Sequence, residues 1–252
     1  MKAAKLFAKE SDLCAAFMAA AKRERDAWTF YPETEGWDIL AVRADGAQLG
    51  IEAKLSLNTQ VVCQALPSYW GGGCLGPDFR AVLVPAGGTQ NGLETICAAL
   101  GIGIITISRN PHERGRDLAL YDYNPRLPGA SIAPPTWHEW APARRHRLPE
   151  YVPDVTAGSS APVQLTSWKI RAIKIEIMLE RRPVTRRDFK AAGIDPTRWT
   201  SPAFGWLKLT TEGYVKGEAF PNFSAQHPIN YEQIKADFAK WDWSASTVGA
   251  LV

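Results

Sequence analysis

The sequence predicts an α/β domain with a mixed sheet, followed by a small, mainly helical domain. In the first half, four apolar runs of strand length alternate with segments of helical periodicity. These runs span residues 37–42, 49–55, 79–84 and 102–107. The succession of strand, helix and strand between residues 79 and 107 is typical of a parallel βαβ unit. From residue 165 onward, helical periodicity dominates.

The elements of the first half are bounded by local signals. Residues 5 to about 26 should form a helix, because their apolar side chains fall on one helical face. Asp45-Gly46 is a turn sequence, so the first two strands should form a hairpin. Further helices are expected at residues 58–66, ended by Pro67, and at residues 91–100.

The composition excludes several classes of protein. With 46% hydrophobic and 22% charged residues, the 252-residue chain is ordinary for a soluble globular protein. No apolar run reaches the roughly 18 residues of a membrane-spanning helix, and no apolar signal sequence follows the first lysines. We therefore expect a cytoplasmic protein of a prokaryotic or phage-infected cell, without a membrane partner.

The cysteines and the charge limit the possible cofactors and partners. No two cysteines form a Cys-x-x-Cys pair, so neither zinc nor an iron–sulfur cluster is expected. No Gly-x-x-x-x-Gly-Lys-Ser/Thr sequence is present, which argues against a P-loop ATPase. A net charge of +3 allows a nucleic-acid partner without requiring one.

The chain is predicted to contain two domains joined by a linker. Beyond about residue 125, proline, arginine and tryptophan become frequent and periodicity fades. Residues 154–162 have the composition of a linker. We place the first domain at residues 1–150, the linker at 151–164 and the second domain at 165–252.

One strand of the first domain carries chemistry-bearing side chains. Because residues alternate between the two faces of a strand, Glu52 and Lys54 share a face. The hairpin partner brings Asp38, which interrupts an apolar strand, toward the same face. Two carboxylates and a lysine on a largely buried sheet are costly without a function. The alternative is that Glu52 and Lys54 are an exposed ion pair on an edge hairpin.

These residue types are suited to metal-assisted phosphodiester hydrolysis. Mg²⁺ prefers carboxylate, carbonyl and water oxygens, which Asp38, Glu52 and the carbonyl of Ala53 could supply. Mn²⁺ could substitute for Mg²⁺. The metal would activate a water molecule and neutralise the phosphate, while Lys54 would stabilise the developing negative charge.

A helix, a strand with Asp38, a turn, and then Glu52-Ala53-Lys54 resemble the PD-(D/E)xK nuclease superfamily, over roughly residues 5–108. The resemblance implies the restriction-endonuclease-like fold and a Mg²⁺-dependent nuclease. It also implies a metal-assisting glutamate on the first helix, for which Glu10 fits best and Glu24 is the alternative.

In RecB-like members of this superfamily, a glutamine follows the Glu-x-Lys strand on the next helix. Gln60 and Gln64 occupy that region, and Gln60 is taken as the candidate catalytic residue. Gln64 and Tyr69 are one residue further apart than the usual Gln-x-x-x-Tyr spacing. The alternative for both glutamines is plain helix surface.

The second domain has helix caps and a hairpin pattern. Thr166 or Ser167 can begin a helix that runs to about residue 181, and Thr185 can begin a second that Gly193 ends. A short helix at 196–199, a hairpin or a strand with a loop within 204–215, and an amphipathic segment at 231–241 follow.

This order resembles a winged helix-turn-helix, which implies DNA binding. Residues 165–218 contain eleven Lys or Arg and six Asp or Glu, an excess of five positive charges. The candidate nucleic-acid contacts are the basic residues Arg186, Arg187, Lys190, Arg198, Lys208 and Lys216. The alternative is a small helical subdomain with a solvated basic face.

The sequence therefore predicts a Mg²⁺-dependent nuclease that cuts DNA through Asp38, Glu52 and Lys54. Two alternatives stay open: a non-catalytic DNA-binding or regulatory protein on a nuclease-like scaffold, and a protein-interaction module in a larger phage or defence assembly. A homodimer is a possible oligomeric state. DNA and RNA, and endonuclease and exonuclease, are not distinguished by these residues.

Overall fold

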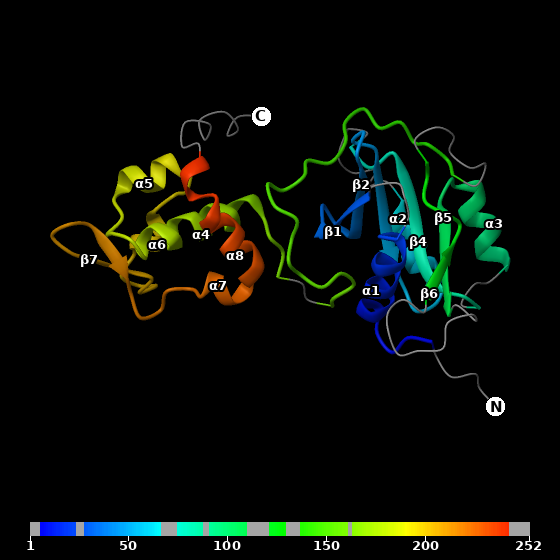
Figure 1. The fold of residues 1–252 in the computed structure, drawn as a ribbon, viewed down its shortest axis with the longest axis horizontal. Helices are drawn as coiled ribbons and strands as arrows, with labels where there is room; N and C mark the ends of the chain where they lie inside the picture. Colours follow the sequence, from blue (N-terminus) through cyan, green and yellow to red (C-terminus); the bar gives the residue numbers. More distant parts are fainter. Residues whose placement is uncertain are drawn as a thin grey trace. The chain divides into compact units, whose positions relative to one another are not determined.

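The computed structural model describes residues 6–23, 28–66, 75–87, 91–109, 121–129, 137–160 and 163–241 (Figure 1). The chain divides into two units, each described by itself. Unit 1 comprises Met1–Leu148 and Val155–Pro162, and unit 2 comprises Pro149–Asp154 and Val163–Val252. The segment 151–164, predicted as a linker, thus contributes residues to both units.

A six-stranded mixed sheet forms the centre of unit 1, with its strands in chain order. Strands β1, β2 and β3 are antiparallel, β3, β4 and β5 are parallel, and β6 pairs antiparallel with β5. This arrangement confirms the predicted α/β class, the mixed sheet and the parallel βαβ unit. The strands are β1 (Trp28–Thr34), β2 (Trp37–Arg43), β3 (Gln48–Ala53), β4 (Phe79–Pro85), β5 (Gly103–Arg109) and β6 (Tyr121–Asn124).

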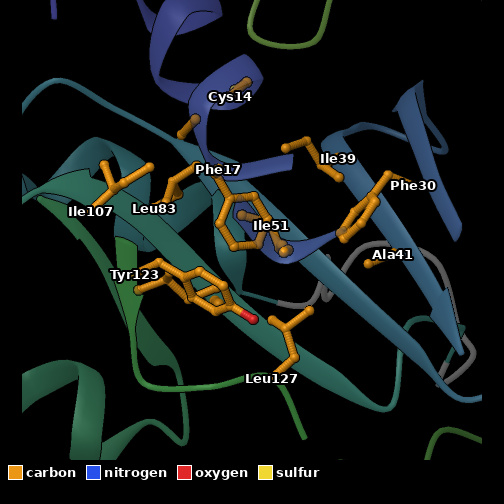
Figure 2. Close-up of a cluster of buried hydrophobic side chains, with 14 of the residues drawn as sticks. Cys14, Phe17, Phe30, Ile39, Ala41, Ile51, Leu83, Ile107, Tyr123 and Leu127 are labelled. Carbon is orange, nitrogen blue, oxygen red and sulfur yellow. The ribbon is translucent and has the colours of Figure 1, made fainter. Parts of the chain in front are cut away.

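Helices cover both faces of this sheet. On one face, α1 (Glu10–Ala21) buries Leu13, Cys14 and Phe17 against apolar residues of β2, β3, β4 and β5 (Figure 2). On the other face, α2 (Thr59–Ala65) and α3 (Asn91–Ala99) contribute buried residues to a separate apolar cluster. Because both faces are covered, the inner strands are apolar along most of their length, as the sequence pattern indicated.

Two differences from the predicted sheet have local causes. The predicted strand at 49–55 ends at Ala53, just before Lys54, and the chain turns from there toward Asn58. The edge strands β1 and β6 were not predicted. Pro32 lies within β1, and proline is tolerated in a sheet mainly on such edge strands. Glu35 and Gly36, both with positive φ, form the two-residue turn from β1 to β2.

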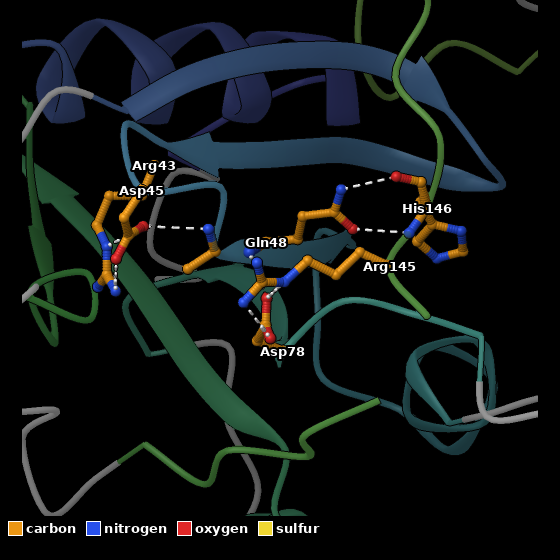
Figure 3. Close-up of polar contacts among 7 residues, drawn as sticks. Arg43, Asp45, Gln48, Asp78, Arg145 and His146 are labelled. Carbon is orange, nitrogen blue, oxygen red and sulfur yellow. Dashed lines mark hydrogen bonds and ion pairs between the residues drawn. The ribbon is translucent and has the colours of Figure 1, made fainter. Parts of the chain in front are cut away.

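A polar network fixes the start of β3 (Figure 3). The buried carboxylate of Asp78 accepts the backbone N–H of Gln48 at 2.7 Å. It also accepts hydrogen bonds from Nε and Nη2 of Arg145, at 2.7 and 2.9 Å. The Gln48 side chain exchanges two hydrogen bonds with the backbone of His146. These bonds attach the irregular segment around residue 146 to the sheet, and so hold β3 in place for the site at its other end.

Unit 2 begins with capped helices, as predicted. In α4 (Ser167–Leu179), Thr166 caps the start by accepting from Lys169 N at 3.2 Å. In α5 (Arg186–Ala191), the Asp188 carboxylate accepts the backbone N–H of Thr185 at 2.7 Å. The elements that follow are α6 (Thr197–Thr200), β7 (Leu207–Leu209), β8 (Tyr214–Lys216), α7 (Phe223–Gln226), α8 (Pro228–Ala236) and the 3₁₀ turn η3 (Phe238–Lys240).

The hairpin β7–β8 confirms the predicted one, whereas the last helix begins earlier than expected. Pro228 occupies the first turn of α8, where its fixed φ suits a helix and its missing N–H costs nothing. The Asp154 carboxylate accepts the next two backbone N–H groups, of Ile229 and Asn230, at 2.8 and 3.1 Å. In the described part of the chain, no helix is long and apolar enough to cross a membrane.

Candidate functional site

Strands β2 and β3 bring Asp38 and Glu52 together. Their register pairs Ile39 with Ile51, so Asp38 and Glu52 are the next residues on the two strands. The backbone N–H of Ala53 donates to Asp38 Oδ2 at 2.8 Å, which fixes that carboxylate beside the end of β3. Glu52 is only 5% exposed. The alternative of an exposed pair on an edge hairpin is therefore wrong for Glu52, because β3 is an inner strand.

The lysine of the predicted site is held by the first helix. Lys54 Nζ forms an ion pair with Glu10 Oε2 at 3.0 Å, and both side chains are partly buried. Glu10 is the first residue of α1, whose next turn packs on the sheet. The four residues Glu10, Asp38, Glu52 and Lys54 therefore form one electrostatic group. Glu24, the alternative helix glutamate, lies outside the described residues.

Two carboxyl groups of this cluster, those of Glu52 and Asp38, resist ionisation. Burial, followed by the charge of Asp38, raises the pKa of Glu52 to about 8, although Lys54 works against the shift. Burial also raises the pKa of Asp38, against the lowering effect of the Ala53 N–H group. Displaced pKa values of this kind cluster at functional sites.

Glu52 has no partner that would offset its burial. Within the described ranges, its carboxylate makes no hydrogen bond or ion pair with another side chain or backbone group. Burial without such a partner disfavours the ionised form of Glu52. A bound cation would remove both the burial cost and the repulsion from Asp38.

Glu33 is a further acidic residue of this cluster, which sequence reasoning missed. It lies near the end of β1, is 9% exposed and has φ of 47°. Its Oε1 accepts the backbone N–H of Ser159 at 3.1 Å. Burial and the charge of Asp38 raise its pKa. The available signal was an acidic residue just before the turn Glu35-Gly36, but Pro32 obscured the strand.

A distant segment packs over the acidic end of α1. Gly158 lies so close that a Cβ there would be 2.9 Å from Cys14 Sγ and 3.1 Å from the carbonyl oxygen of Glu10. Only glycine fits this approach, and Gly158 also adopts positive φ. Burial, together with the carboxylates of Asp38 and Glu33, raises the pKa of the Cys14 thiol. Cys14 is thus an inert packing residue at the base of the cluster.

No family model, curated protein or solved structure matches this chain. The chemistry of the site therefore rests on the geometry of its own residues.

The donor set of the cluster fits a hard divalent cation better than a soft one. No three His, Cys, Asp or Glu side chains in the described ranges form a ready-made metal cage. Mg²⁺ does not require one, because it keeps several waters and is commonly bound by one or two carboxylates. Asp38, Glu52 and the adjacent Ala53 carbonyl could hold such an ion. Glu10 could join them only by giving up its ion pair with Lys54.

The predicted glutamines lie on the surface of α2. Gln60 is exposed in the first turn of that helix, which Asn58 caps by accepting from Val61 N at 3.0 Å. Gln64 is exposed in the last turn. Neither makes a hydrogen bond to Glu52 or Lys54 among the described residues. Tyr69 lies outside the part of the chain that the structure describes.

The six basic residues of unit 2 that were predicted to contact nucleic acid fall into two groups. Arg186, Arg187 and Lys190 are exposed on α5, and Arg198 is exposed on α6. In contrast, Lys208 pairs with the exposed Glu218 at 2.8 Å, and Lys216 pairs with the buried Glu176 at 2.9 Å. Lys216 therefore stabilises the fold, and of these six residues the four on α5 and α6 are exposed without an acidic partner in the described ranges.

Proposed function

We propose that unit 1 is a metal-dependent nuclease that hydrolyses phosphodiester bonds in DNA. The observation that carries the proposal is Glu52, a buried carboxylate next to Asp38 without a hydrogen-bond partner among the described residues. The ion pair of Lys54 with Glu10, next to these carboxylates, supports it further. A strand order β1 to β6 with helices on both faces is compatible with a PD-(D/E)xK-like fold, which we include in the proposal.

Each residue has a task that follows from its position. Asp38 and Glu52, with the Ala53 carbonyl, would hold Mg²⁺. When bound, Mg²⁺ supplies Lewis-acid stabilisation of the phosphate and a water of lowered pKa. Asp38 is kept in orientation by the Ala53 N–H group. Lys54 places a positive charge beside the carboxylates, where it would stabilise negative charge developing on the phosphate.

We propose unit 2 as the module that binds DNA. Its order of elements supports a winged-helix relationship: helix α4, a single bridge between Val184 and Tyr214, helices α5 and α6, then the hairpin β7–β8. Helix α6 has only four residues, so it offers little length for reading bases in a groove. The exposed basic residues of α5 suit contacts to phosphates.

Cleavage of supercoiled and linear plasmid by the purified full chain tests the nuclease. Reactions contain Mg²⁺, Mn²⁺ or EDTA, beside a Lys54→Ala variant shown to be folded. We expect nicking or degradation that requires metal and falls by about 10²-fold in the variant. The product pattern would distinguish an endonuclease from an exonuclease.

Two results would contradict this proposal. Cleavage that persists in EDTA would exclude a metal-dependent site. Absence of cleavage with either metal, together with salt-sensitive DNA binding, would favour the non-catalytic DNA-binding alternative.

A further inference from the structure

Unit 2 contains an aromatic cluster that reaches the surface. At its centre, Trp199 is 1% exposed and contacts the ring of Trp206 at 5.5 Å. Outward from Trp206 lies Phe204, with ring centroids 6.4 Å apart. Phe204 is 47% exposed. The cluster is thus anchored in the core at one end and open to solvent at the other.

An arginine lies over the open end. The Arg198 guanidinium carbon is 4.8 Å from the Trp206 ring centroid and 5.2 Å from that of Phe204. Arg198 is exposed and makes no hydrogen bond or ion pair with any side chain in the described part of the chain. Four other cations of residues 165–218 do pair with acids, namely Lys174, Arg182, Lys208 and Lys216. The charge of Arg198 therefore stays available to an anionic partner.

We propose that Phe204, Trp206 and Arg198 form a stacking site for an unpaired base of single-stranded nucleic acid. Two aromatic rings and a planar guanidinium with a free positive charge offer a base both a π-face and a phosphate contact. Bases inside a duplex stack on one another and expose only their edges, so such a platform favours single strands, frayed ends or extruded bases. The site is independent of base identity, because every base has a π-face.

This inference rests on the proposed function only in taking nucleic acid as the partner of unit 2. It goes further by naming single-stranded nucleic acid as the preferred form. It also gives Arg198 a stacking role, in addition to the kind of phosphate contact expected of the basic residues on α5.

The test measures binding of the full chain in EDTA, where a metal-dependent nuclease cannot cut its ligand. Fluorescein-labelled oligothymidine and a duplex of the same length are titrated separately and followed by anisotropy. We expect Phe204→Ala to weaken binding of the single strand by about tenfold and binding of the duplex by less than about twofold. The salt dependence of single-strand binding should remain as in the parent, because no phosphate contact is lost.

Three further variants sharpen this test. Phe204→Trp should retain single-strand binding, whereas Phe204→Leu, which keeps an apolar side chain without a ring, should lose it. Leu209→Ala is the matched control, because Leu209 is apolar, 73% exposed and on β7, the strand that follows Phe204. Thermal melting shows whether each variant is folded, and Phe204→Leu is read in place of Phe204→Ala if the alanine variant is not.

The possible outcomes separate this inference from the nuclease proposal. Equal loss of single-strand and duplex binding in Phe204→Leu, loss of the same size in Leu209→Ala, or no binding of oligothymidine by the parent would each overturn the stacking site. A parent that binds oligothymidine through Phe204 but never cleaves DNA would support the stacking site and contradict the nuclease. If the parent cleaves DNA but the Phe204 variants bind oligothymidine as tightly as the parent does, the result would support the nuclease and contradict the stacking site.

Discussion

Glu176 in unit 2 and Glu52 in unit 1 are both buried, but their charges are compensated differently. Glu176 in α4 is 3% exposed, and its Oε1 accepts Lys216 Nζ at 2.9 Å. Glu52 in β3 is 5% exposed, and its burial and the like charge of Asp38 raise its pKa. Lys54, the cation beside it, is bonded to Glu10.

This difference separates a structural carboxylate from a candidate functional one. Pairing through Oε1 with a lysine offsets part of the cost of burying Glu176, although Oε2 makes no hydrogen bond, and the pair joins α4 to the hairpin β7–β8. Glu52 retains its burial cost and the repulsion from Asp38, because the chain directs its nearest cation elsewhere. Such strain is kept where a ligand relieves it, so the comparison favours a cation at Glu52 and none at Glu176.

The largest expected effect comes from neutralising each glutamate in turn. Glu52→Gln should reduce metal-dependent plasmid cleavage by at least about 10²-fold, because the ion loses a charged ligand. Glu176→Gln should leave cleavage within about threefold of the parent below its melting temperature, because Glu176 lies in unit 2 and touches no residue of the predicted catalytic site. Initial rates at saturating Mg²⁺ measure both. Equal losses in the two variants would contradict the distinction.

The second prediction concerns the dependence of stability on pH. The pKa of Glu52 is about 8 in the folded chain, above its ordinary value of 4.5. The folded state therefore binds the Glu52 proton more tightly than the unfolded state does. This proton binding stabilises the folded state fully below about pH 4.5, and the stabilisation is lost as pH rises through 8. In EDTA, the melting temperature of the parent should fall across this window more steeply than that of Glu52→Gln.

A magnesium titration at the upper end of this window adds a second readout. At pH 8, Mg²⁺ should raise the melting temperature of the parent, because the ion binds the ionised carboxylates. The rise should be small in Glu52→Gln. If the melting temperatures of the two proteins changed in parallel across the whole pH range, Glu52 would not be the group that causes the pH dependence.

The third prediction breaks the pair in unit 2. Lys216→Met should lower the free energy of unfolding by about 2 kcal/mol, because it leaves the buried Glu176 without a cation. This value is below the usual cost of a broken buried pair, since the Lys216 side chain is 38% exposed. Urea unfolding measures it, and the double variant Lys216→Met with Glu176→Leu should recover most of the loss. No recovery would mean that Lys216 contributes through packing alone.

The central part of the site could be predicted because it depends on short-range patterns. Alternation along β3, a turn at Asp45-Gly46 and one polar residue in β2 suffice to place Asp38 beside Glu52. The prediction of a glutamate from the first helix required the further assumption that this helix packs near the end of β3. Glu10 does form an ion pair with Lys54.

The remaining features depend on tertiary contacts that leave no local signal. Glu33 joins the cluster through Ser159, which is 126 residues away along the chain. Lys216 was predicted to contact phosphate, yet α4 supplies Glu176 to it across 40 residues. Sequence charge counts cannot separate cations committed to the fold from those left for a partner, which only the packing of helix and hairpin decides.

The smallest expected effects on cleavage concern Gln60, which the sequence predicted as a site residue, and Glu33, which only the structure places there. Glu33→Gln should raise the Mg²⁺ concentration for half-maximal cleavage by about tenfold with little change at saturation, because Glu33 acts beside Asp38 as an outer support. Gln60→Ala should change cleavage by less than about threefold, because Gln60 is exposed on α2 and contacts no other site residue in the described ranges. Rates over a range of Mg²⁺ concentrations separate the two effects. A larger loss for Gln60→Ala would mean that α2 moves toward Glu52 when DNA binds, and would restore the role that the family resemblance implies.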